Sequence, residues 1–123
     1  MRGDTPASLE CMMSVNSPFT PTGNTVTFTG VITTPPTPVQ ANSYSLGSNQ
    51  YRILNAGTVT VFLGVGNTAA GATANATVVT NNAAAIPLLA GTDEILSFLP
   101  NAYFTGITGS SSAVVYITPG SGS

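Results

Sequence analysis

The chain has 123 residues, of which 42% are hydrophobic and only 5% are charged, and its formal net charge is −2. About a quarter of the residues are charged in an average soluble protein, so the expected surface is neutral and rich in hydroxyl groups. Two arginines and no lysine exclude the basic surface that nucleic-acid binding needs. No apolar run approaches the roughly 18 residues of a transmembrane helix, so we expect no membrane partner.

The inventory of reactive side chains excludes several kinds of enzyme. There is no histidine and only one cysteine, Cys11, which rules out a Ser-His-Asp triad, a Cys-His dyad, a zinc site and an intrachain disulfide. We therefore expect a non-enzymatic chain without a cofactor or metal. Arg2 is followed by Asp4, Pro6 and Glu10 rather than by an apolar core, so the N-terminus predicts no secretory signal and a chain made in a cytosol.

Residues 1–24 contain three prolines and no sustained hydrophobic period, which predicts an extended N-terminal arm. The arm carries apolar side chains that we expect to contact the chain's own domain, a neighbouring subunit or a foreign surface. These candidate interface residues are Leu9, Cys11, Met12, Met13, Val15 and Phe19.

The segment Thr25–Thr33 alternates between apolar and hydroxyl side chains, and this period of two predicts a strand. The prolines of residues 34–38 end it, because proline lacks the amide hydrogen of a strand ladder. Val39–Leu46 is then expected to form a short edge strand.

Two β-type runs, Tyr51–Leu54 and Thr58–Val65, lie at the centre of the chain. The second run places four aliphatic residues on one face, as in a half-buried strand: Val59, Val61, Leu63 and Val65. The connection Asn55-Ala56-Gly57 ends in glycine, so we predict that the two runs form a hairpin whose glycine has a positive φ angle.

Residues 67–85 are low in complexity and consist of Ala, Thr, Asn and Gly with little apolar bulk. Their alanines favour a helix, but the interspersed Gly71, threonines and asparagines disfavour it. We expect a surface loop in which Thr77–Thr80 pairs briefly.

The last third of the chain again predicts strands. Ile86–Ala90 carries Pro87 and is expected at a sheet edge. The further expected strands are Asp93–Leu99, Ala102–Thr108 and Ala113–Thr118. The spacing of these elements predicts an all-β sandwich or jelly roll of seven or eight short antiparallel strands over residues 25–118, followed by a flexible tail at residues 119–123.

Three features of the sequence could support catalysis or binding. Asp93 and Glu94 are neighbours on a predicted strand, so they point to opposite faces and do not form the facing carboxylate pair of a glycosidase; one of them is expected to pair with Arg52. Arg2-Gly3-Asp4 matches an integrin-binding tripeptide, but its place beside the initiator methionine and the expected cytosolic origin disfavour adhesion. Aromatic residues that could form a sugar platform are expected mainly in the core or an interface; they are Tyr44, Tyr51, Tyr103, Phe104 and Tyr116.

Four stretches carry a resemblance to known proteins: "YRILNAGTVTVFLGVGNTAAGATA", "AAIPLLAGTDEILSF", "PNAYFTGIT" and "SAVVYITPGSG". The resemblance covers roughly Tyr44 to Gly122, and the part from Pro100 to Gly120 is the most specific. In this pattern an Arg-x-x-Asn strand leads to a Gly-bounded strand, an Ala/Thr loop and a closing Tyr-Ile-Thr-Pro-Gly strand. The pattern resembles small structural proteins of tailed bacteriophages, of the capsid decoration (cement) type.

The resemblance implies a jelly-roll module that sits on the outer surface of an icosahedral shell as a homotrimer and bridges major capsid protein subunits. Its expected location is the virion, after synthesis in the bacterial cytoplasm. Similar modules occur in head fibres and tail knobs, so a module that binds host glycans or receptors is the alternative. A soluble monomer kept dispersed by Thr, Ser and Asn, and a cryptic glycan hydrolase that uses Asp93 or Glu94, are further readings of the sequence.

Overall fold

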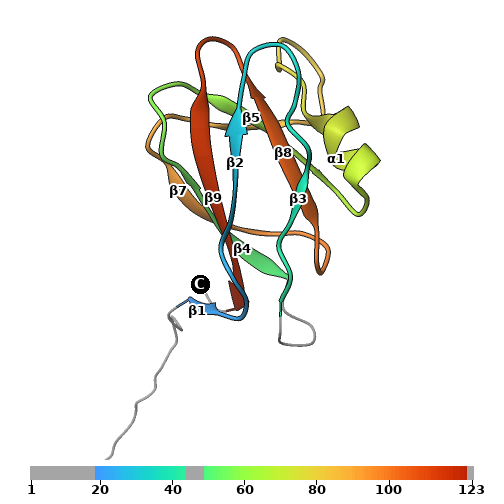
Figure 1. Ribbon diagram of the computed structural model, residues 1–123, viewed down its shortest axis with the longest axis vertical. Helices are drawn as coiled ribbons and strands as arrows, with labels where there is room; N and C mark the ends of the chain where they lie inside the picture. Colours follow the sequence, from blue (N-terminus) through green and yellow to red (C-terminus); the bar gives the residue numbers. More distant parts are fainter. Residues whose placement is uncertain (1–18, 44–48, 122–123) are drawn as a thin grey trace, which may run out of the picture.

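The computed structural model describes residues 19–43 and 49–121, which form nine strands and one short helix (Figure 1). The strands are β1 (Thr20–Pro21), β2 (Val26–Gly30), β3 (Val39–Gln40), β4 (Gln50–Asn55), β5 (Val61–Gly66), β6 (Ile86–Leu88), β7 (Asp93–Ser97), β8 (Tyr103–Thr108) and β9 (Ala113–Ser121). The helix is α1 (Ala69–Asn75).

The strands form two antiparallel sheets that pack face to face. Sheet A has the order β1-β9-β4-β7, with β2 also paired to β9, and sheet B has the order β3-β8-β5-β6. From β2 to β9 the chain crosses between the sheets at every step except β5 to β6. This strand order is that of a jelly roll, so the predicted all-β sandwich is confirmed.

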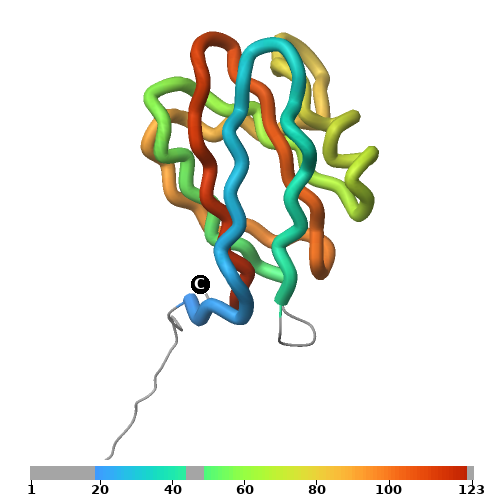
Figure 2. The backbone as a smooth tube through the Cα atoms, viewed as in Figure 1, coloured from blue at the N-terminus to red at the C-terminus, as the bar shows by residue number. Residues whose placement is uncertain are grey.

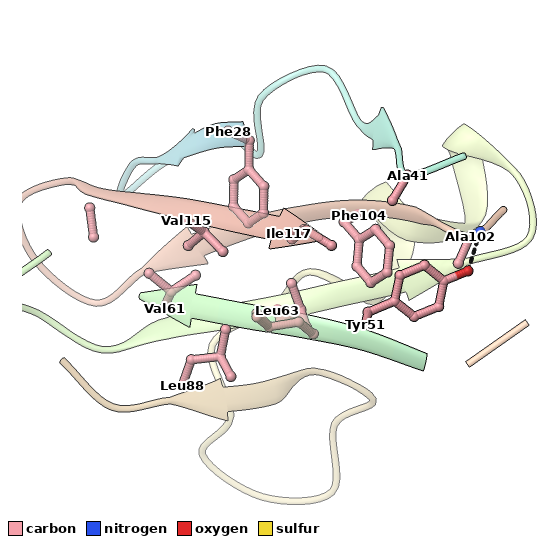
Figure 3. Close-up of a cluster of buried hydrophobic side chains, with 12 residues drawn as sticks. Phe28, Ala41, Tyr51, Val61, Leu63, Leu88, Ala102, Phe104, Val115 and Ile117 are labelled. Atoms are coloured by element: carbon pink, nitrogen blue, oxygen red, sulfur yellow. Dashed lines mark hydrogen bonds between the residues drawn. The ribbon is translucent and has the colours of Figure 1, made fainter. Parts of the chain in front are cut away.

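The core lies between the sheets and is built by the alternation of each strand. In β4, for example, Tyr51 and Ile53 are fully buried while Arg52 between them is exposed. Figure 3 shows the buried cluster, to which both sheets contribute. Its members are Phe28, Ala41, Tyr51, Ile53, Val61, Leu63, Leu88, Ala102, Phe104, Ala113, Val115 and Ile117.

Tyr51 connects this core to the loop between β7 and β8. Its ring packs edge to face on Phe104, with centroids 5.0 Å apart, and lies 6.0 Å from the ring of Phe98. Its hydroxyl donates to the Leu99 carbonyl at 2.6 Å. The same hydroxyl accepts from the Ala102 amide at 3.2 Å, which Figure 3 shows as a dashed line. Because both hydrogen-bonding roles of the phenol are filled, a large polar side chain is buried without an unpaired group.

The predicted hairpin of Tyr51–Leu54 and Thr58–Val65 is wrong. Both strands exist, but β4 lies in sheet A and β5 in sheet B, so the connection is an arch between the sheets (Figure 2). Gly57 does not have a positive φ angle either. Its role is steric, because a Cβ atom there would lie 2.8 Å from the Cα of Ala113 and closer still to its Cβ.

The side chain of Asn55, which is fully buried, holds this arch in place. Its Nδ2 group donates to the carbonyls of Val59 and Leu88, each at 2.9 Å, and its Oδ1 accepts from the Gly57 amide at 3.0 Å. The backbone of Asn55 also accepts from the amide of Gly91 at 3.0 Å. One amide side chain therefore joins the end of β4, the start of the path into β5 and the end of β6.

The expected loop over residues 67–85 contains a helix, α1, which the sequence did not predict. The Thr68 hydroxyl caps it by accepting from the Gly71 amide at 3.0 Å, and Asn75 Nδ2 donates to the Val65 carbonyl at 2.8 Å. The helix packs on β5, where a Cβ at Gly64 would lie 2.6 Å from the Ala76 nitrogen. Glycine on β5 therefore gives the small residues of α1 a surface to pack on, which helix propensity alone does not reveal.

Other boundaries differ from the expectations in smaller ways. Thr77–Thr80 forms no strand, and β3 is only two residues long, while residues 44–46 of its expected range lie outside the described residues.

Strand β9 continues to Ser121, so the expected tail does not begin at Pro119. Pro119 fits in β9 because its nitrogen faces away from β4. The amide of Ala56 bonds to the carbonyl of Val114, and bonded pairs recur at every second residue of an antiparallel ladder, so the even-numbered residues of β9 bond to β4.

Asn55→Ala is expected to lower the free energy of unfolding by about 2–4 kcal/mol, because it leaves an amide and two carbonyls without partners inside the protein. Chemical denaturation measures this. Asn67→Ala is the matched control, since Asn67 is exposed and its loss should change stability by less than about 0.5 kcal/mol. Equal stability of the two variants would contradict the role given to Asn55.

Candidate interaction surfaces

The described residues contain few groups that support chemistry. Within residues 19–43 and 49–121 the charged side chains are Arg52, Asp93 and Glu94, and no three His, Cys, Asp or Glu residues gather there as metal ligands. Asp93 and Glu94 pair in register with Leu54 and Ile53 respectively, which belong to opposite faces of sheet A. The two carboxylates therefore point to opposite faces of the sheet and do not face one gap, which confirms the prediction.

Arg52 and Asp93 form a two-pronged ion pair on the outer face of sheet A. Arg52 Nε lies 2.9 Å from Oδ1, and its Nη2 lies 2.5 Å from Oδ2. The hydrogen bond from Arg52 and its positive charge hold the pKa of Asp93 below its ordinary value, and the same contact raises the pKa of Arg52. Both side chains are well exposed, so solvent screens the attraction and the pair adds little stability. The expectation that one of the two carboxylates pairs with Arg52 is confirmed.

Replacing Asp93 by Asn tests this pair through its pH dependence. Because the folded-state pKa is lowered, the carboxylate stabilises the fold above its unfolded pKa of about 3.9, and this contribution disappears as pH falls through the lower folded value. We expect the wild type to melt at a slightly higher temperature than Asp93→Asn at pH 7, and this difference to shrink and then vanish as pH falls through the lowered folded-state pKa. Glu94→Gln, on the other face of the strand, is the control. Because it keeps Asp93, its melting temperature should exceed that of Asp93→Asn at pH 7, and this difference should disappear in acid as it does for the wild type.

The outer face of sheet A is the broadest regular surface of the described chain. Tyr116 lies between Thr27 and Leu54 in the strand register, and its side chain is 42% exposed. In the next row the hydroxyls of Thr25 and Thr118 share a hydrogen bond of 2.7 Å. The only ionic contact on this face is the Arg52–Asp93 pair, as far as residues 19–43 and 49–121 are concerned. The face is therefore nearly neutral and is covered by hydroxyl and apolar groups.

A hollow of about 490 Å³ lies at the end of this face where the arm enters the domain. Phe19 forms one wall, and its ring packs against Gly120, where a Cβ atom would overlap it. Arg52 and Ile95 form the opposite side. The full lining is Phe19, Pro21, Gly23, Thr25, Arg52, Ile95 and Thr118.

A second hollow, of about 440 Å³, has only uncharged side chains around it. Phe98 and Leu99, from the loop after β7, form one wall, and Leu99 is 55% exposed. The remaining lining residues are Val65, Gly66, Ala84, Ile86 and Ala102. This hollow lacks polar side chains that would orient a substrate, so it offers apolar contact rather than a reaction site.

Of the predicted interface residues, the structure describes only Phe19, which is half-buried against its own domain. The others lie outside the described residues: Leu9, Cys11, Met12, Met13 and Val15. Sequence reasoning did not select Ile95 or Leu99, because apolar residues in a strand or turn give no sign of exposure until the sheet order is known.

The aromatic residues do not form a common platform. Tyr51 and Phe104 are fully buried, Tyr103 is half-buried, and Tyr116 is exposed on sheet A. Tyr44 lies outside the described residues. The expectation that these rings serve mainly the core is confirmed for Tyr51 and Phe104, while Tyr116 is available for contact.

Comparison with protein-family models, with curated proteins and with solved structures found no match to this chain. Among the described residues, no helix has the length and apolar character needed to cross a membrane.

Proposed function

We propose that this chain is a non-enzymatic structural protein of a phage virion, which decorates an icosahedral capsid and stabilises it by bridging major capsid protein subunits. The observation that carries the proposal is the outer face of sheet A. It is neutral, covered by hydroxyl and apolar groups, and holds one exposed ion pair between Arg52 and Asp93. Such a face contacts another protein surface without leaving an unpaired charge in the contact.

The resemblance to decoration proteins supports the same function. Its four sequence stretches correspond to β4 through α1, to β6 and β7, to β8, and to β9, so they cover most strands of the jelly roll. Jelly rolls are common among viral capsid domains. A module of this kind gains affinity by repetition, because many weak contacts add up when one assembly touches several subunits of a shell. The homotrimer implied by the resemblance stays a prediction.

Co-sedimentation with emptied capsids of the parent phage tests the proposal. The wild-type chain should pellet with the shells and raise their melting temperature, because it links neighbouring subunits. Tyr116→Asp should weaken binding by roughly tenfold or more, since it places an unpaired charge at the centre of the contact.

Val78→Asp is the matched control for this experiment. Val78 is 41% exposed, almost the same as Tyr116, but it follows α1 and lies outside sheet A. Its variant should bind like the wild type. A wild-type chain that stays in the supernatant would contradict the capsid role, whereas equal losses in both variants would contradict the choice of face.

A head-fibre or tail-knob module that binds host glycans is the second candidate, and the exposed ring of Tyr116 favours it. Sugars stack on exposed aromatic rings, and the neighbouring hydroxyl of Thr27 belongs to the same face. Under this alternative a glycan array gives saturable binding that Tyr116→Ala abolishes, and capsids do not retain the chain. Capsid binding without any glycan signal would exclude it.

A further inference from the structure

The free edge of strand β7 differs from the other sheet edges of the described chain. In sheet B, β3 is two residues long, and β6 is three residues long and contains Pro87. In sheet A, β1 and β2 form the edge opposite β7. That edge is partly connected to sheet B, because Val31, directly after β2, forms a bridge with Ile107. By contrast β7 has five residues, contains no proline, and pairs only with β4 among the described residues (Figure 1).

The hydrogen-bond phase determines which groups this edge presents. The Asn55 amide bonds to the Thr92 carbonyl, and the Phe98 amide bonds to the Asn49 carbonyl. In an antiparallel ladder bonded pairs recur at every second residue. The even-numbered residues of β7 therefore bond to β4, and the amides and carbonyls that point away from the sheet belong to Asp93, Ile95 and Ser97.

The margin around this edge is also unusually apolar. The described chain leaves seven large apolar side chains exposed, and three of them belong to the short stretch around β7. They are Leu89, Ile95 and Leu99, with exposed fractions of 62%, 37% and 55%. Exposed apolar groups beside unpaired backbone groups are typical of a strand edge that joins another chain.

We propose that β7 pairs with β7 of a second copy of this chain, antiparallel and about a two-fold axis at Ile95. In this register Ile95 lies opposite its own copy, and Asp93 lies opposite Ser97 of the second copy. Every outward amide and carbonyl of the five-residue strand then has a partner, because the pattern is self-complementary. The two A sheets become one continuous sheet across the contact.

Charge disfavours the neighbouring register whose axis lies at Glu94. Shifting the axis to Glu94 would keep the same hydrogen-bond phase, but it would place the two Glu94 side chains directly opposite each other, and like charges in that position are destabilising. With the axis at Ile95, Glu94 lies opposite Leu96 of the second copy, and Asp93 keeps its own partner, Arg52. No acidic side chain then faces another.

This inference does not rest on the capsid proposal, since it follows from the edge alone. A two-fold contact closes with two copies and builds no trimer by itself. It therefore predicts a dimer for a chain that is otherwise monomeric. If the chain forms a trimer through another surface, the β7 contact is predicted to join these trimers in pairs.

Ile95→Pro in the full-length chain tests the pairing. The Ile95 amide points away from β4, so proline there removes no hydrogen bond inside the domain, while it removes two of the bonds between copies. Sedimentation equilibrium should show the wild type associating with increasing concentration, and the variant should have a dissociation constant at least roughly tenfold higher. Circular dichroism and the melting temperature report that the variant is folded.

Substitutions of Ser97 test the register without depending on proline. Ser97→Asp would face Asp93 of the second copy and should weaken association severalfold, whereas Ser97→Lys should strengthen it by a similar factor. A wild-type chain that stays monomeric throughout, or an assembly that all three variants leave unchanged, would overturn the proposal. Loss of assembly in Met12→Asp/Met13→Asp, with Ile95→Pro unaffected, would assign self-association to the N-terminal arm and would also overturn it.

Discussion

The buried amide of Asn55 is the contact on which the rest of this structure depends. It donates to the carbonyls of Val59 and Leu88 and accepts from the amide of Gly57, so it directs the chain out of sheet A and into sheet B. If β4 and β5 formed a hairpin, they would be neighbours in one sheet. Because they form an arch, β4 lies between β9 and β7, which creates both the outer face of sheet A and the free edge of β7. The two surfaces proposed to bind partners are therefore consequences of one polar contact in the interior.

The low charge of the chain has a clear structural counterpart. Arg52 and Asp93 neutralise each other on sheet A, and the remaining polarity of that face comes from threonine hydroxyls, some of which bond to each other. Such a surface loses little when water is removed from it, since few groups need strong hydration. This is why a neutral, hydroxyl-rich domain suits an assembly, where most of its contacts are weak and repeated.

Much of the fold could be predicted from the sequence, because alternation in β2, β4, β5, β8 and β9 is a local property that directly reports which side chains face the core. The errors concern information that is not local. Nothing near Asn55 distinguishes a tight hairpin from an arch, since its partners Leu88 and Gly91 are more than thirty residues away. Helix α1 depends on the glycines of β5, and Pro119 fits in β9 only because its amide position faces away from β4. The exposure of Ile95 was harder to predict from the sequence. It depends on β7 being the last strand of its sheet, which follows from the order of all the strands.

Nuclear Overhauser effects between backbone protons around β4 test the arch most directly. The arch predicts Hα–Hα contacts between Ile53 and Ile117 and between Asn55 and Val115, because these pairs lie opposite each other without direct hydrogen bonds in the ladder of β4 and β9. It also predicts no such contacts between β4 and β5. A ladder of contacts between residues 51–54 and 58–65 would show a hairpin. It would contradict the sheet order, and with it the outer face and the edge on which both proposals depend.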